Sequence, residues 1–212
     1  MKTTAVKKTP VVNFPNGNKI HTKQNPDGEL TIKNNALGKW IDSINKAPGA
    51  FFLHLDALSG LSCYSIHYKC HMTGKLMVME YKESPEETED QKKAYMDALL
   101  FDLELFQGDE PIVVFDKDQF ELQMQKQFPI MYEHTDAIDQ LMERVYDLKE
   151  IFETRMYYDT LFKEATIREI YRVLYGHGHK EKMQIPDSLA MYQIFEALQS
   201  IYYQVTGLRV IA

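Results

Sequence analysis

The chain has 212 residues, with 31 acidic against 24 basic side chains and a net charge of -7. This length can bury a core without disulfides, and the acidic balance argues against a general nucleic-acid binder, since such proteins usually carry a basic surface. The first forty residues are nevertheless cationic, with lysines at Lys2, Lys7, Lys8, Lys19, Lys23, Lys33 and Lys39. This segment is either a basic arm that contacts DNA or ordinary solvated charge.

The two cysteines and the N-terminus bear on the cellular compartment. Cys63 and Cys70 are separated by an odd spacing, which in a strand places them on opposite faces, so we expect free thiols in a reducing compartment. Residues 1–10 are polar and basic and do not resemble a secretory signal. No segment approaches the roughly 20 apolar residues that span a bilayer. We expect a soluble cytoplasmic protein without a membrane partner.

The first half of the chain alternates turn signals with short apolar segments. Pro15-Asn16-Gly17 and Asn25-Pro26-Asp27-Gly28 are typical of hairpin turns between β-prone segments. These segments are residues 11–14, 19–22 and 29–33. Apolar residues at helical spacing over residues 36–46, followed by Pro48-Gly49, predict a helix. Three strands are expected next, over residues 50–56, 62–70 and 75–82.

A crossover unit is predicted after the third strand. Ser84 and Pro85 are typical of a helix start, so we expect a helix over residues 85–106. The apolar segment 111–116 then predicts a further strand. Strand, helix and strand in this order favour parallel strands of one mixed sheet. The predicted fold class is α/β, with a mixed β-sheet core, flanking helices, N-terminal β-hairpins and an α-helical C-terminal extension.

The C-terminal part is predicted to be almost continuous amphipathic helix. Apolar residues recur at helical spacing over residues 136–176 and 188–207. Their many aromatic and methionine side chains are typical of a helix core or a dimer interface. We therefore expect an α/β domain over residues 1–130 and a helical extension over residues 131–212, which packs on that domain or forms an oligomer interface.

The clearest chemical signal is Glu80-Tyr81-Lys82 at the end of the third predicted strand. Residues two apart in a strand share a face, so Glu80 and Lys82 would project together. Phosphodiester hydrolysis with a divalent cation needs hard oxygen ligands and a positive charge near the developing phosphorane. Glu80 could supply a ligand and Lys82 that charge.

Together with Gln91 and Tyr95 on the predicted crossover helix, this pattern resembles the PD-(D/E)xK nuclease superfamily, in its RecB-like and Cas4-like exonuclease branch. The order of helix, hairpin, crossover helix and strand over residues 36–120 is similar to that family's core. The resemblance implies Mg²⁺ or Mn²⁺ as cofactor and DNA as substrate. It also implies a metal-ligand role for Glu80, a catalytic role for Lys82, and Gln91 and Tyr95 as groups that position DNA or the metal shell.

One family feature is missing from the preceding strand. The family has an acidic residue there, whereas the positions expected opposite Glu80 are Ser65, Ile66 and His67. The best available acid is Asp56, which would either reach the site from a neighbouring strand as a second metal ligand and catalytic residue or leave the site incomplete. His54 and His67 could assist as ligands.

Two other groups are weaker candidates. Gly176-His177-Gly178-His179 resembles a metal-binding tract, but no zinc ligand set surrounds it, and a flexible helix cap is the simpler interpretation. Asp116 and Asp118 follow a predicted strand, where acids often serve sites, and the simpler interpretation is that they cap a helix beginning near Gln119.

The sequence favours a metal-dependent deoxyribonuclease. The alternative is a non-catalytic α/β interaction module, either a degenerate nuclease fold or an unrelated α/β module, whose aromatic and methionine-rich helices bind a partner or form a homodimer. The absence of an acid opposite Glu80 in the hairpin and the negative net charge of the chain support this alternative.

Overall fold

The structure is a computed structural model in which the following segments are described. They are residues 11–13, 15, 19–21, 34–58, 61–70, 76–82, 84, 86–88, 90–91, 94, 108–127, 135–151, 166–176 and 178–206. Residues 56–58, 61–70 and 76–82 of the central strands are described by their backbone.

A small hairpin opens the described part of the chain. Strands β1 (Val11–Asn13) and β2 (Lys19–His21) pair antiparallel, with Val12 opposite Ile20. This confirms the hairpin predicted around the first turn signal. The third β-prone segment, residues 29–33, lies outside the described residues.

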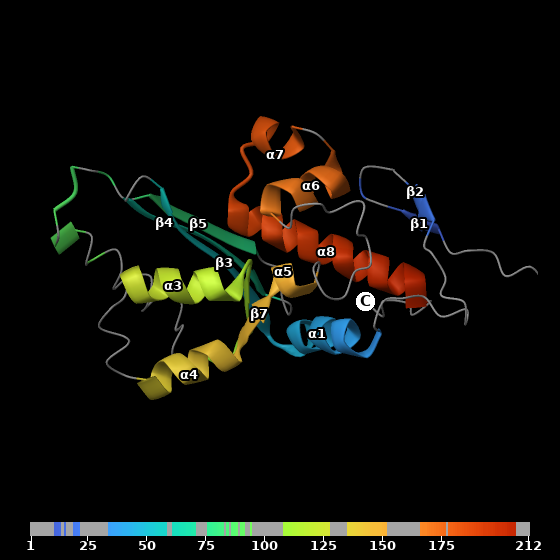
Figure 1. The fold of residues 1–212 in the computed structure, drawn as a ribbon, viewed down its shortest axis with the longest axis horizontal. Helices are drawn as coiled ribbons and strands as arrows, with labels where there is room; N and C mark the ends of the chain where they lie inside the picture. The colour runs from blue at the N-terminus through green and yellow to red at the C-terminus, as the bar shows by residue number, and fades with distance from the viewer. Residues whose placement is uncertain are drawn as a thin grey trace, which may run out of the picture.

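The core of the fold is a five-stranded mixed sheet in the order β5-β4-β3-β6-β7 (Figure 1). Its strands are β3 (Gly49–Leu58), β4 (Leu61–Cys70), β5 (Leu76–Lys82), β6 (Ile112–Val114) and β7 (Val145–Asp147). The pairs β3–β4 and β4–β5 are antiparallel, whereas β3–β6 and β6–β7 are parallel. The α/β fold class with a mixed sheet is thus confirmed.

Helices surround this sheet and account for most of the remaining described residues. They are α1 (Asn34–Lys46), α3 (Lys117–Gln127), α4 (Thr135–Glu143), α5 (Leu148–Glu150), α6 (Ile167–Tyr175), α7 (His179–Lys182) and α8 (Asp187–Thr206). None of the helices in the described segments is both long and apolar enough to cross a membrane.

Two of the predicted helices differ from the structure. The prediction of continuous helix from residue 136 was wrong at β7, because Val145 and Tyr146 pair with β6 and gain a place in the sheet. Local periodicity does not report such a distant pairing. The helix predicted to start at residue 85 also starts later, since Glu87 and Thr88 are not helical and the first helical residue described there is Asp90.

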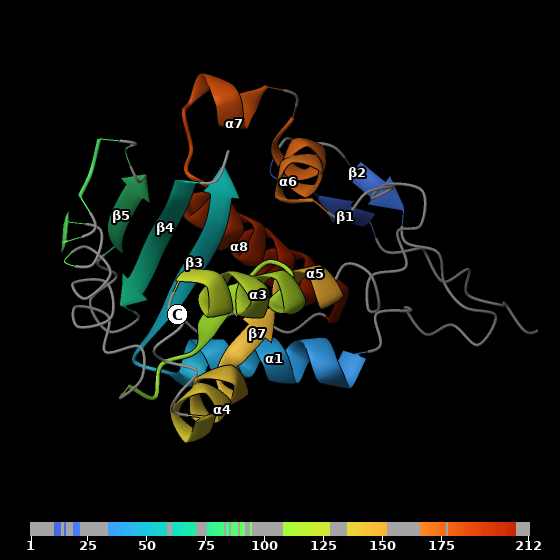
Figure 2. The same ribbon diagram turned by 60° about the vertical axis from the view of Figure 1, so that its left-hand side comes forward.

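Helix α8 covers one face of the sheet and contributes much of the core. The ring of Phe52 on β3 lies 5.3 Å from the ring of Tyr192 and 5.6 Å from that of Phe195, measured between centroids. Residues 52, 54 and 56 therefore belong to the α8-covered face, while α3 lies on the opposite side of β3 (Figure 2). The described aromatic and methionine side chains of α8 are largely buried, as one of the two predicted interpretations required.

Helix α1 packs closely against the same helix. Trp40 contacts Phe195, with ring centroids 5.5 Å apart. Gly38 lies so near Tyr202 that a β-carbon at this position would collide with the tyrosine ring. The contact with α1 thus fixes α8 over the sheet, with its N-terminal residue Asp187 close to β3.

Candidate functional site

The strand register places the predicted site residues in two cross-strand rows. In the first row, Ser65 on β4 lies between His54 on β3 and Glu80 on β5. Ser65 is one of the three positions expected opposite Glu80, and the register selects it over Ile66 and His67. The nearest ionisable residue to Glu80 along this row is therefore His54.

The second row contains the two remaining predicted site residues that lie on strands, Asp56 and Lys82. Cys63 on β4 lies between Asp56 on β3 and Lys82 on β5. Since residues two apart share a face, this row and the row of Glu80 belong to one face of the sheet. It is the face that α8 covers.

Asp56 and Glu80 are not direct neighbours. Strand β4 lies between them, and they are offset by two residues along the strand direction. With the usual spacings between strands and between residues, their Cα atoms are about 12 Å apart. Asp56 is aligned instead with Lys82. A cation held by Asp56 would thus need further ligands closer to β3 than Glu80.

Helix α8 brings such a group to β3. Asp187, the first residue of α8, places Oδ2 3.6 Å from Nε2 of His54, and its Oδ1 lies 2.8 Å from Nζ of Lys180 on α7. The side chains are partly shielded, with 23% of His54 and 39% of Asp187 exposed. Sequence analysis missed Asp187, because nothing local links it to a strand 133 positions earlier in the printed sequence.

Gln91, which was predicted to position DNA or the metal shell, makes hydrogen bonds with Thr88 three residues earlier. Thr88 donates its backbone N–H to Oε1 of Gln91 over 2.9 Å, and Gln91 donates its own N–H to Oγ1 of Thr88 over 3.3 Å. This reciprocal pair is a capping box, which satisfies backbone donors at a helix start. Tyr95 lies outside the described residues, so the DNA-positioning role of both side chains stays a prediction.

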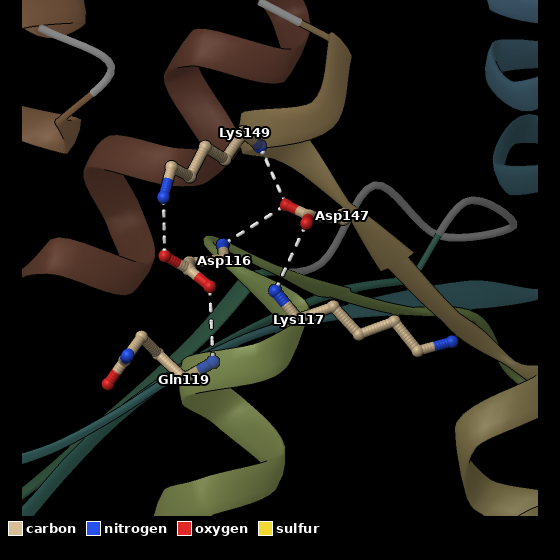
Figure 3. Close-up of polar contacts among 5 residues, drawn as sticks. All are labelled: Asp116, Lys117, Gln119, Asp147 and Lys149. Carbon is tan, nitrogen blue, oxygen red and sulfur yellow. Dashed lines mark hydrogen bonds and ion pairs between the residues drawn. The ribbon is translucent and has the colours of Figure 1, made fainter. Parts of the chain in front are cut away.

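A second polar group lies where the parallel strands β6 and β7 end (Figure 3). We call Asp116, Lys117, Asp147 and Lys149 the aspartate clasp. The Asp147 carboxylate accepts backbone N–H groups from Asp116, Lys117 and Lys149 at 3.0, 3.1 and 2.8 Å. One carboxylate thus ties the start of α3 to β7 and α5.

Asp116 completes the aspartate clasp. Its Oδ1 accepts the N–H of Gln119 over 3.1 Å, and its Oδ2 accepts Nζ of Lys149 over 2.6 Å. Burial raises the pKa of Asp116, but the hydrogen bond from Lys149, the backbone N–H groups and the positive charge of Lys149 together bring the pKa below its ordinary value. The predicted capping role of Asp116 is confirmed, and its φ of 68° lies in the left-handed region.

The glycine and histidine tract has structural partners. Gly176 ends α6 with a φ of 99° and donates its N–H to the carbonyl of Arg172, as the predicted helix cap requires. Nδ1 of His179 lies 3.2 Å from Oη of Tyr171, which donates to Oε1 of Gln193 over 2.6 Å. Burial raises the pKa of Tyr171. His177 lies outside the described residues.

The donor types on the α8-covered face suit a divalent cation. Carboxylates are the ligands of Mg²⁺ and Mn²⁺, and imidazole is a ligand of transition metals. Within the segments that the structure describes, no three His, Cys, Asp or Glu side chains come close enough to hold a metal. The side chains of Asp56 and Glu80 are outside that description. The suitability of this face for a metal is therefore judged from the strand register and from the distance between His54 and Asp187.

One known family profile matches half of the chain. The profile of a domain of unknown function (DUF2779) matches residues 61–166. The chain belongs to this family. The DUF2779 region includes Glu80, Lys82 and the aspartate clasp, whereas His54 and Asp187 lie on either side of it. No curated protein and no solved structure matches the chain.

Proposed function

We propose that the chain hydrolyses phosphodiester bonds in DNA with Mg²⁺ or Mn²⁺ at the α8-covered face of the sheet. The observation that carries this proposal is the pair of cross-strand rows, which assemble Asp56, Glu80 and Lys82 on one face of three neighbouring strands. Both rows lie in the carboxyl-terminal half of β3, beyond the end of its parallel neighbour β6. Ligands of α/β proteins commonly bind beyond the carboxyl ends of parallel strands.

Each residue has a distinct role in this proposal. Asp56 and Glu80 would each contribute a carboxylate to cation binding, with a further ligand closer to β3 completing the shell at Asp56, and the bound cation would polarise the scissile phosphate and offset its charge. Lys82, aligned with Asp56, would stabilise negative charge on the phosphorane or the departing oxygen. Gln91 and Tyr95 would contact DNA from the crossover helix, and the lysines of the first forty residues would attract its backbone.

Substitution of Lys82 tests the proposal. The Lys82→Ala variant should lose at least about 100-fold in Mg²⁺- or Mn²⁺-dependent cleavage of DNA, the order expected when one charge-stabilising donor is removed. Its circular dichroism spectrum should match that of the wild type. Lys126→Ala, which removes an exposed lysine of α3 outside the basic N-terminal segment, is the matched control and should cleave DNA at the wild-type rate. Equal cleavage by the Lys82→Ala variant would remove Lys82 from the chemistry.

The second candidate is a non-catalytic interaction module. It is favoured by the capping box, which engages the side-chain oxygen of Gln91, and by the ion pair that Asp187 already makes with Lys180. The partner would be another protein or a second copy of this chain in the cytoplasm. Melting temperature with and without millimolar Mg²⁺ or Mn²⁺ separates the candidates, since a cation that binds the folded state raises it. An unchanged melting temperature favours the interaction module.

A further inference from the structure

We propose that Asp187 and His54, together with Asp56, form a binding site for a divalent transition metal, with Mn²⁺ preferred over Mg²⁺. The inference rests on the proposed function and supplies the second acid that the hairpin lacks. The second acid would be Asp187 at the start of α8, because the strand before Glu80 has no acid in the expected position.

The distance between the two side chains supports a shared cation. Nε2 of His54 and Oδ2 of Asp187 are 3.6 Å apart, which is longer than a hydrogen bond. Mg²⁺ and Mn²⁺ prefer octahedral coordination, in which adjacent ligands about 2.1 Å from the ion lie roughly 3.0 Å apart. The two atoms would therefore need to approach each other by about 0.6 Å to bind one such ion.

The third ligand comes from the strand register. Asp56 is two residues beyond His54 on β3 and shares its sheet face, at a Cα separation of about 6.7 Å. Asp56 is thus closer to His54 along the sheet than to Glu80. A set of one imidazole and two carboxylates favours Mn²⁺ over Mg²⁺, because Mg²⁺ binds oxygen ligands and imidazole suits transition metals.

Lys180 lowers the affinity of this site for a metal ion. Its Nζ lies 2.8 Å from Oδ1 of Asp187, the carboxylate oxygen that does not approach His54. A positive charge at this distance weakens the attraction of Asp187 for a cation. Removal of the charge should therefore tighten metal binding, whereas removal of a purely structural ion pair would leave metal binding unchanged.

The test measures Mn²⁺ and Mg²⁺ affinity from the rise in melting temperature of the full chain, with Mn²⁺ binding also followed by the loss of the free-ion electron paramagnetic resonance signal. Wild-type protein should bind Mn²⁺ more tightly than Mg²⁺. Asp187→Asn and His54→Gln should each weaken Mn²⁺ binding by about tenfold or more, at least the effect of losing a supporting group around a metal. Lys180→Met should strengthen it by about fivefold.

The control is Asp118→Asn, which changes an exposed acid on α3 and should leave Mn²⁺ affinity unchanged. Wild-type Mn²⁺ affinity in the Asp187→Asn variant would overturn the inference, and so would weaker binding in the Lys180→Met variant. If those results came with DNA cleavage that depends on Lys82, the proposed function would stand without this site. Loss of Mn²⁺ binding in the Asp187→Asn variant without cleavage by the wild type would instead support the site and reject the nuclease.

Discussion

The aspartate clasp and the Asp187–His54 pair both combine acids with a lysine, and they differ in how fully the acids are bonded. Asp147 accepts three backbone N–H groups, and Asp116 accepts Lys149 Nζ over 2.6 Å. Asp187 makes one short contact, with Lys180, and lies 3.6 Å from His54. A carboxylate whose bonds are made to the backbone holds the fold together, whereas one held by side chains can exchange its partner for a ligand.

The largest difference between the two regions should appear in stability. Asp147→Ala leaves three backbone N–H groups without their acceptor, which should lower the free energy of unfolding by about 3 kcal/mol. Asp187→Ala removes only partly exposed ion pairs and should cost less than about 1 kcal/mol. Urea denaturation of both variants without metal measures the contrast. Equal losses would mean that Asp187 also has a structural role.

The pH dependence of stability sharpens the comparison. Because the pKa of Asp116 is lowered in the folded state, its contribution is present above about pH 4, the ordinary pKa of aspartate, and is lost as the pH falls through the folded value. Lys149→Met should therefore cost about 1 kcal/mol at pH 7, and this difference from the wild type should shrink below pH 4.

The control for this pH series is Lys126→Met, which changes an exposed lysine of α3. Its unfolding free energy should stay close to the wild-type value at each pH. A Lys149→Met difference that remains constant down to pH 2 would mean that Lys149 stabilises the clasp by packing rather than by charge.

The smallest effect should come from backbone conformation. Asp116 and Gln184 both have positive φ, 68° and 50°, which costs a residue other than glycine roughly 1 kcal/mol. Gln184→Gly relieves this cost and should raise the unfolding free energy by up to about 1 kcal/mol. Asp116→Gly relieves the same cost but loses the α3 cap and the bond to Lys149, so its net effect should be destabilising. Thermal melts of the two variants should shift in opposite directions.

Local signals in the sequence predicted much of the fold. Turn residues located the first hairpin, and helical spacing with Pro48-Gly49 located α1. Alternating and apolar segments located β3, β4, β5 and β6, and an acid after an apolar strand predicted the cap of α3. These features depend on residues within a few positions of one another, which is the range that propensity and periodicity report.

The parts that were missed depend on distant pairings. Strand β7 has three residues and is recognisable by its pairing with β6. Asp147 becomes a structural acid through bonds to Asp116 and Lys117, about thirty residues earlier. Asp187 approaches His54 because α8 packs across the sheet. The acid predicted to join Glu80 was Asp56 on β3, whereas Asp187, which lies 3.6 Å from His54 of that row, comes from the C-terminal helix.

The most direct test is the position of Mn²⁺ in crystals soaked with the ion, located by anomalous scattering. The account predicts a peak between Nε2 of His54 and Oδ2 of Asp187, on the α8-covered face, with no peak at the aspartate clasp. A peak between Asp116 and Asp147 with Lys149 displaced, or no peak at either place in a crystal that shows both regions clearly, would contradict it.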